Sequence, residues 1–169
     1  GFFGIHPHVA NKDPLPEVPF CDVSIVVENW NRYTPGLVVW HTHGWMNKAQ
    51  NVMNTFNTPL LPQNYPAIVF AGSCRNSHAQ TPGNLGTEVL YNSAIAFVGG
   101  TEDLLGYQIH NITPLFVEKI RDNFSVGDAV KAIHNSSNNI YMNKCIALYG
   151  CPEVALNLPN TPAVVPGPQ

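Results

Sequence analysis

Charged side chains are scarce in this sequence of 169 residues, of which Asp, Glu, Lys and Arg make up only 11%. A typical soluble domain has roughly 25%. The eight Lys and Arg residues form no cluster and the net charge is -3, so the chain lacks the basic surface that nucleic-acid binding requires. No apolar run approaches the roughly 20 residues that cross a bilayer. The length suits one globular domain, and the hydrophobic share of 44% allows a core.

Cysteine is also scarce. The four cysteines are Cys21, Cys74, Cys145 and Cys151, and no two of them form a CxxC pair. This set excludes a disulfide-stabilised scaffold and argues against a cysteine-bound zinc ion, so we interpret the four as separate thiols. The chain begins without Met and without a signal-peptide pattern, and we therefore expect a processed or partial chain.

Four short apolar runs predict the strands of a sheet. Each run is bounded by residues that break secondary structure, and each is apolar continuously rather than alternately, which is typical of parallel strands covered on both faces. The runs are residues 36–40, 67–70, 94–98 and 145–149. We therefore predict a three-layer α/β/α domain with a mainly parallel sheet.

Segments of helical length separate these runs. Residues 86–92 form one candidate, and residues 115–121 form another because they follow Pro114, which suits a helix start. A third helix is expected after Ser125, a favourable N-cap, with Ala129, Val130 and Ile133 on its inner face. Residues 22–31 fit either a strand or an amphipathic helix. Their β-branched side chains favour the strand.

The chemistry of such a domain is expected where the strands end, because ligands bind beyond the carboxyl ends of a parallel sheet. His41, His43 and Gly44 follow the first run, Cys74 follows the second, and Glu102 and Asp103 follow the third. The fourth run is followed by Cys151. Two of these ends therefore offer a base and a nucleophile.

A thiol and an imidazole form a hydrolytic pair when they meet. Only the thiolate attacks a carbonyl well, and an imidazole can take the thiol proton and later return it to the leaving amine. The oxyanion then needs donors, which the N–H groups of Gly44 and Cys74 would supply. His41 and His43 point the same way on an extended chain, and the glycine that follows favours His43 as the base. His41 is then a packing residue or one that supports the site without contacting the substrate.

The blocks LVVWHTHG and AIVFAGSC, with Cys74 following His43 by 31 residues, resemble the caspase-like (clan CD) cysteine peptidases. The short spacing is most similar to that of the gingipain family. The segments CIALYGCPEVAL and SVGDAVKAI also resemble that family's closing strand and last helix, although Cys151 stands where the family has Asp. The resemblance covers about residues 20–158.

The resemblance implies a caspase-hemoglobinase-like domain over residues 22–158, with residues 22–31 helical. An irregular arm would precede it at 1–21, and a Pro-rich extended tail would follow at 159–169. Further strands normally precede the histidine block of this fold. We therefore expect a sheet that is incomplete on its N-terminal side, with another chain or segment supplying the missing strands.

The function that the resemblance implies is that of a cysteine endopeptidase with Cys74 as nucleophile, His43 as base and Gly44 beside the oxyanion. Its partner would be a peptide or protein substrate, and no cofactor is needed. A sharper hypothesis is that Glu102 or Asp103 lines a pocket for a basic P1 side chain, with Trp45 as a wall. The low charge and the gingipain resemblance together indicate an extracytoplasmic or secreted protein.

Two other functions remain open from the sequence. The chain is a catalytically silent binding or assembly module of the same fold, or it is a metal hydrolase. In the second case His41 and His43 form an HxH half-site completed by His6, His8 or His78, although no carboxylate accompanies them in a familiar pattern. A structural calcium ion is also left open.

Overall fold

A computed structural model describes residues 3–4, 22–136 and 144–156 of the chain. Its centre is a five-stranded sheet with the order β1-β2-β6-β7-β8. The first four of these strands run parallel, and β8 runs antiparallel to β7. The strands are β1 (Phe3–Gly4), β2 (Leu37–His41), β6 (Ala67–Gly72), β7 (Ala94–Gly100) and β8 (Ile146–Gly150). The predicted α/β class with a mainly parallel sheet is confirmed.

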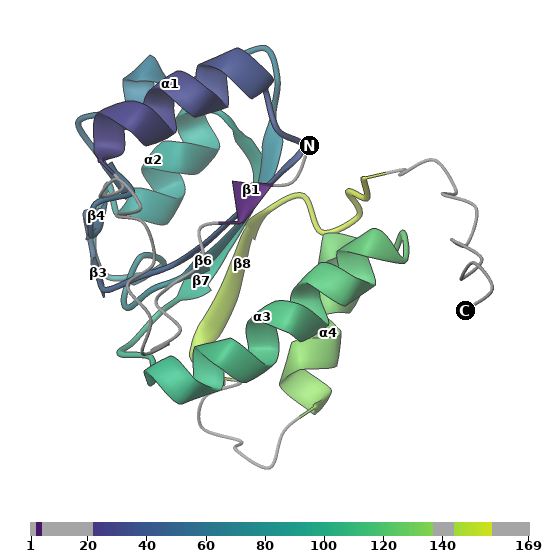
Figure 1. The fold of residues 1–169 in the computed structure, drawn as a ribbon. Coiled ribbons are helices and arrows are strands. Elements are labelled where there is room, and N and C mark those ends of the chain that lie inside the picture. The colour runs from purple at the N-terminus through teal and green to yellow at the C-terminus, as the bar shows by residue number, and fades with distance from the viewer. Residues whose placement is uncertain (1–2, 5–21, 137–143, 157–169) are drawn as a thin grey trace, which may run out of the picture.

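Helices cover both faces of this sheet, as Figure 1 shows. On one face lie α1 (Val23–Tyr33) and α2 (Leu85–Asn92), and on the other lie α3 (Gly106–Arg121) and α4 (Val126–Asn135). A 3-10 turn, η1 (Thr58–Leu60), precedes β6. The predicted three layers are therefore present.

Strand β6 shows why the apolar runs are continuous. All six of its residues are buried, with side chains that alternate between the two helical layers. Ile68 and Phe70 belong to the core beneath α3 and α4, whereas Val69 and Ala71 belong to the core beneath α1 and α2. Because both faces are covered, neither set of alternating positions can be polar.

The segment 22–31 forms helix α1, as the resemblance implied, and the alternative strand is wrong. The side chain of Asp22 caps the helix by accepting a hydrogen bond from the backbone N–H of Ser24 at 3.0 Å. Trp30 is buried in the core beneath α1 and α2. A cap and one apolar face thus outweigh the strand preference of the β-branched side chains.

The predicted start of α3 at Pro114 is wrong, because the helix begins at Gly106 and Pro114 lies inside it. Proline removes one helical hydrogen bond, at a cost of about 3 kcal/mol. Buried side chains recur on both sides of it, at Ile109, Ile112 and Phe116, and their burial keeps the helix continuous.

Helix α4 has the predicted cap and inner face. The Ser125 hydroxyl accepts a hydrogen bond from the Asp128 N–H at 3.1 Å and donates one to its carboxylate at 2.8 Å. Ala129, Val130 and Ile133 are buried.

The antiparallel direction of β8 corrects one expectation about the strand ends. Ile146 pairs with Gly100, and Gly150 pairs with Ala96, so β8 ends at the opposite edge from β2, β6 and β7. Cys151 therefore lies away from the edge where we expected it. The buried Cys145, just before β8, lies at that edge instead, and its carbonyl accepts the Thr101 N–H at 2.8 Å.

A second, small antiparallel sheet follows β2 directly, and the sequence analysis did not predict it. It consists of β3 (Gly44–Trp45), β4 (Lys48–Ala49) and β5 (Met53–Asn54). Strands of two residues are too short to show an alternating pattern.

Part of the predicted terminal structure lies outside the described residues. Phe3–Gly4, within the arm that we expected to be irregular, pair with Val38 and Val39 of β2. The rest of that arm up to Cys21 and the tail 159–169 are not described. Among the described helices, none has the length and apolar character needed to cross a membrane.

The packing of α3 against the sheet predicts a stability effect. Phe116 is fully buried, and its ring lies 4.7 Å from that of Phe70. Replacing Phe116 by Ala should lower the free energy of unfolding by about 3–5 kcal/mol, because it removes apolar contacts and leaves a cavity. Tyr91, which is 93% exposed, provides the control. Its Tyr91→Ala variant should unfold within about 0.5 kcal/mol of the parent in urea. Equal losses in both variants would contradict the packing described.

Candidate active site

Cys74 lies in the turn that follows β6, at the edge of the sheet where β2, β6 and β7 end. Its side chain is half-buried, whereas the preceding Ser73 is fully buried and accepts a hydrogen bond from Trp40 Nε1 at 3.1 Å. Arg75, the next residue, has a left-handed backbone with φ of 54°. The turn therefore presents the sulfur at the sheet edge while its neighbour is held inside.

Gly44 lies directly against the backbone of Cys74. A Cβ atom at position 44 would be 2.5 Å from the Cys74 carbonyl oxygen, 2.7 Å from its nitrogen and 2.8 Å from Ser73 Cβ. Real Cβ atoms do not approach other atoms so closely, so only glycine fits here. The His43–Gly44 segment and Cys74 are thus brought together, and the amide groups of Gly44 and Cys74 lie side by side in space.

The backbone on both sides of His43 is fixed. The N–H of Thr42 donates to the Gly72 carbonyl at 3.1 Å, which extends the pairing of β2 with β6 by one residue. The carbonyl of His43 accepts the N–H of Gln50 at 2.8 Å. His43 itself is exposed.

His41 occupies a different environment from His43. Its ring packs edge-on against that of His110 in α3, with centroids 4.5 Å apart. Burial is the largest cause that lowers the pKa of His41, and the charges of His110 and His43 lower it further. This position agrees with the packing role expected for His41. The sequence alone does not point to His110, because no local pattern links a helical histidine to a strand end.

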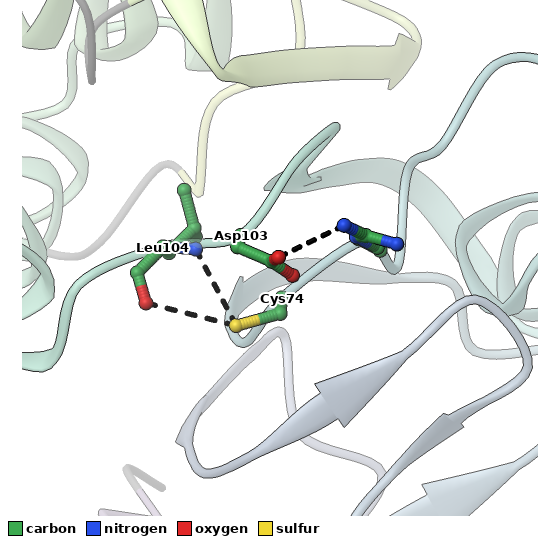
Figure 2. A network of polar contacts seen from close by, with 4 residues as sticks. Cys74, Asp103 and Leu104 are labelled. Carbon is green, nitrogen blue, oxygen red and sulfur yellow. Dashed lines mark hydrogen bonds and ion pairs between the residues drawn. The ribbon is translucent and has the colours of Figure 1, made fainter.

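The sulfur of Cys74 contacts the backbone of the loop between β7 and α3, as Figure 2 shows. The N–H of Leu104 lies 3.4 Å from Sγ, and the Leu104 carbonyl oxygen lies 3.6 Å from it. Leu104 is buried. This contact cannot be predicted from residue types, since any residue carries the same backbone groups.

The acidic residues of this loop differ in their surroundings. Asp103 forms an ion pair with Arg75 at 2.8 Å, and both side chains are partly exposed. The Glu102 carbonyl accepts the Arg75 N–H at 3.1 Å, while the Glu102 side chain is exposed. Trp45, the second residue of β3, has 57% of its surface exposed. The Arg75 backbone and side chain thus tie this loop to the turn that carries Cys74.

The metal alternative gains no geometric support from the part of the chain that is described. No three His, Cys, Asp or Glu side chains converge there to hold a metal ion. The Nδ1 atom of His78 lies 3.0 Å from the Thr81 hydroxyl, and His6 and His8 fall outside the described residues.

Comparison with known proteins identifies the fold. No family model matches the chain, and no curated protein matches it in sequence. The crystal structure of the Arg-specific cysteine proteinase gingipain R matches it with a TM-score of 0.64 and 15% identity over 82% of this chain. The complex of the pro- and mature domains of Porphyromonas gingivalis RgpB matches with a TM-score of 0.66 and 14% identity over 80%. The chain has the caspase-like α/β fold of gingipain R, as the sequence resemblance implied.

The match is partial on the side of these proteins. This chain spans 37% of the length of each of the two chains. At such low identity the likeness establishes the fold, and the activity has to be argued from the site.

The close approach at Gly44 predicts the effect of adding one methyl group there. Gly44→Ala should displace the hairpin from Cys74 and lower the melting temperature, since backbone atoms rather than a flexible side chain oppose the new Cβ. Gly106→Ala is the matched control, because nothing lies within 4 Å of a Cβ at that position. Thermal unfolding of the two variants checks this. A Gly44→Ala protein as stable as the control would refute the contact.

The lowered pKa of His41 predicts a loss of stability in acid. The unfolded chain takes up a proton at His41 near the ordinary value of 6.5, before the folded chain does. The contribution of a neutral His41 is therefore complete above pH 6.5 and is lost as the pH falls below it. Melting temperatures measured from pH 7.5 to pH 5 should decline less steeply for His41→Gln than for the parent. Identical slopes would show that His41 is not the group responsible.

Proposed function

We propose that this chain carries the catalytic pair of a cysteine endopeptidase, with His43 as general base and Cys74 as nucleophile. The observation that supports this most is the contact of Gly44 with the Cys74 backbone. It joins a histidine and a cysteine from two adjacent strand ends, at the edge of the sheet where parallel α/β folds bind ligands.

The arrangement suits acyl transfer. His43 takes the proton from the Cys74 thiol, and the sulfur attacks the scissile carbonyl carbon to form a tetrahedral intermediate. The N–H groups of Gly44 and Cys74 are the donors for its oxyanion. As the C–N bond breaks, the imidazolium returns the proton to the leaving amine. Water, deprotonated by His43, then hydrolyses the thioester to release the acid and restore the thiol.

The two sides of the sulfur serve different purposes in this proposal. The buried Leu104 lies against Sγ through its backbone, which leaves the hairpin side for the substrate. There the exposed indole of Trp45 offers an apolar wall, consistent with its proposed role in substrate binding.

A basic P1 side chain is the specificity we propose, with Glu102 rather than Asp103 as the acid that receives it. The Asp103 carboxylate is already paired with Arg75, whereas the Glu102 side chain is exposed on the same loop. A carboxylate close to a cationic side chain gives selectivity through a charge-assisted hydrogen bond. The structural neighbour described as Arg-specific supports the same class of substrate.

The larger assembly and the location remain predictions. β1 is the outermost strand on one side of the described sheet, and we expect the additional segment beyond it. The extracytoplasmic or secreted location follows from composition and resemblance alone.

Cleavage of a fluorogenic peptide library that varies the P1 residue tests the function. Cys74→Ala should abolish cleavage, a fall of at least about a thousandfold in kcat/KM, because the nucleophile is removed. Cys151→Ala is the matched control, since it deletes another half-buried thiol at the opposite edge of the sheet. It should cleave like the parent.

The same assay tests the proposed specificity. Glu102→Gln should reduce the preference for Arg and Lys at P1 while leaving cleavage after other residues unchanged. A parent protein that cleaves nothing would favour the silent binding module, and equal cleavage by parent and Cys74→Ala would exclude Cys74 as nucleophile.

A further inference from the structure

The buried side chain of Asn76 connects the two halves of the candidate site. It lies two residues after Cys74 and has no exposed surface. Its Nδ2 group donates to the carbonyl of Trp45 at 2.5 Å and to that of Lys48 at 3.0 Å. These two carbonyls flank the turn between β3 and β4, the hairpin that begins at Gly44. One amide group on the cysteine turn therefore holds the hairpin of the histidine block.

The other atoms of Asn76 are also engaged. Its Oδ1 accepts a hydrogen bond from the Ser73 hydroxyl, which in turn accepts one from Trp40 Nε1 of β2. Its backbone carbonyl accepts the Gly86 N–H at the start of α2 at 2.8 Å. A buried amide with these partners is fixed in one orientation, because turning it over would place its oxygen against the carbonyl oxygens of Trp45 and Lys48.

His43 is thus bracketed by two attachments to the cysteine strand. Before it, Thr42 is bonded to Gly72 at the end of the β2–β6 ladder. After it, the Asn76 side chain supplies both side-chain hydrogen bonds that join the hairpin to the cysteine turn in the described chain. The hairpin is also held at Met46, whose carbonyl accepts the Leu85 N–H at 2.7 Å and whose sulfur accepts the Thr81 hydroxyl at 2.9 Å. Without the Asn76 bonds the hairpin keeps that anchor but loses its tie to the cysteine turn, which would let His43 and Gly44 shift relative to Cys74.

We propose that Asn76 is a positioning residue of this site, which acts through the hairpin to set the separation of His43 and Gly44 from Cys74. The inference rests on the proposed function, since it assigns Asn76 a role in the geometry of that catalytic pair. Asn76 itself touches neither substrate nor the reacting atoms.

The matching variant is Asn76→Asp, which keeps the shape of the side chain but replaces the donor group with a second oxygen facing two carbonyls. In peptide cleavage we expect kcat to fall by about 100-fold with KM changed little, because a displacement of about 1 Å at reacting groups has an effect of that size. Asn92→Asp is the control. Asn92 also donates to two oxygens, on Thr58 and Glu88, at the far end of α2, so this variant should retain kcat.

A double-mutant cycle between His43 and Asn76 tests the inference without requiring peptidase activity. Its readout is the rate at which iodoacetamide alkylates Cys74 at pH 7, located by peptide mapping. In the parent, His43→Ala should slow alkylation by about tenfold, because the thiolate loses its imidazole partner. In the Asn76→Asp background the same replacement should have little further effect, since His43 is already displaced.

The outcomes separate the two claims. If His43→Ala slows alkylation equally in both backgrounds, the Cys–His pair stands and the role of Asn76 is refuted. If His43→Ala has no effect in the parent, the catalytic pair fails and the inference fails with it. Should Asn76→Asp not fold by circular dichroism, Asn76→Ser replaces it in the cycle. That variant removes the donor to the Trp45 and Lys48 carbonyls without adding a negative charge, and full additivity with His43→Ala would again refute the inference.

Discussion

The close approach of Gly44 to the backbone of Cys74 is the constraint on which the candidate site depends. It requires three things at once: a residue without a side chain at position 44, parallel pairing that brings β2 and β6 to the same edge, and a tight turn at Cys74. The glycine is a single residue choice, the pairing depends on two buried apolar runs, and the turn depends on the left-handed backbone at Arg75. Together they bring the backbone amides of Gly44 and Cys74 close to the thiol. The proposed function adds the imidazole of His43, which would complete the set of groups that acyl transfer uses.

The scaffold makes that constraint durable. β6 is buried along its whole length between two helical layers, so the strand that leads into Cys74 has little freedom to shift. The turn itself is held by polar groups, with Asn76 on the hairpin side and the Arg75–Asp103 pair on the side of Leu104. The exposed ion pair adds little stability by itself. Its effect is geometric, because it holds the loop between β7 and α3, whose backbone contacts the sulfur, against the cysteine turn.

Much of this arrangement could be predicted from the sequence, and the failures have physical reasons. Apolar runs located the central strands, and the rule that parallel strands end at one edge predicted that the segments after β2 and β6, with Gly44 and Cys74, lie together. The direction of β8 could not be read, because a buried run looks the same in either direction. The start of α3 was predicted at Pro114, because proline is typical of a helix start. The helix in fact begins at Gly106, and the apolar residues that precede Pro114 belong to its buried face. The contact of Leu104 with Sγ is made by backbone atoms and leaves no trace in residue type.

The central claim is that Cys74, activated by His43, is the nucleophile of a peptidase. Labelling of the native protein with a peptidyl acyloxymethyl ketone bearing Arg at P1, followed by mass spectrometric mapping of every cysteine, tests it most directly. The account predicts one adduct per chain, on Cys74, that disappears in the His43→Ala variant, while Cys145 and Cys151 stay unmodified. Labelling of Cys151 as readily as Cys74, or labelling of Cys74 that does not depend on His43, would contradict it.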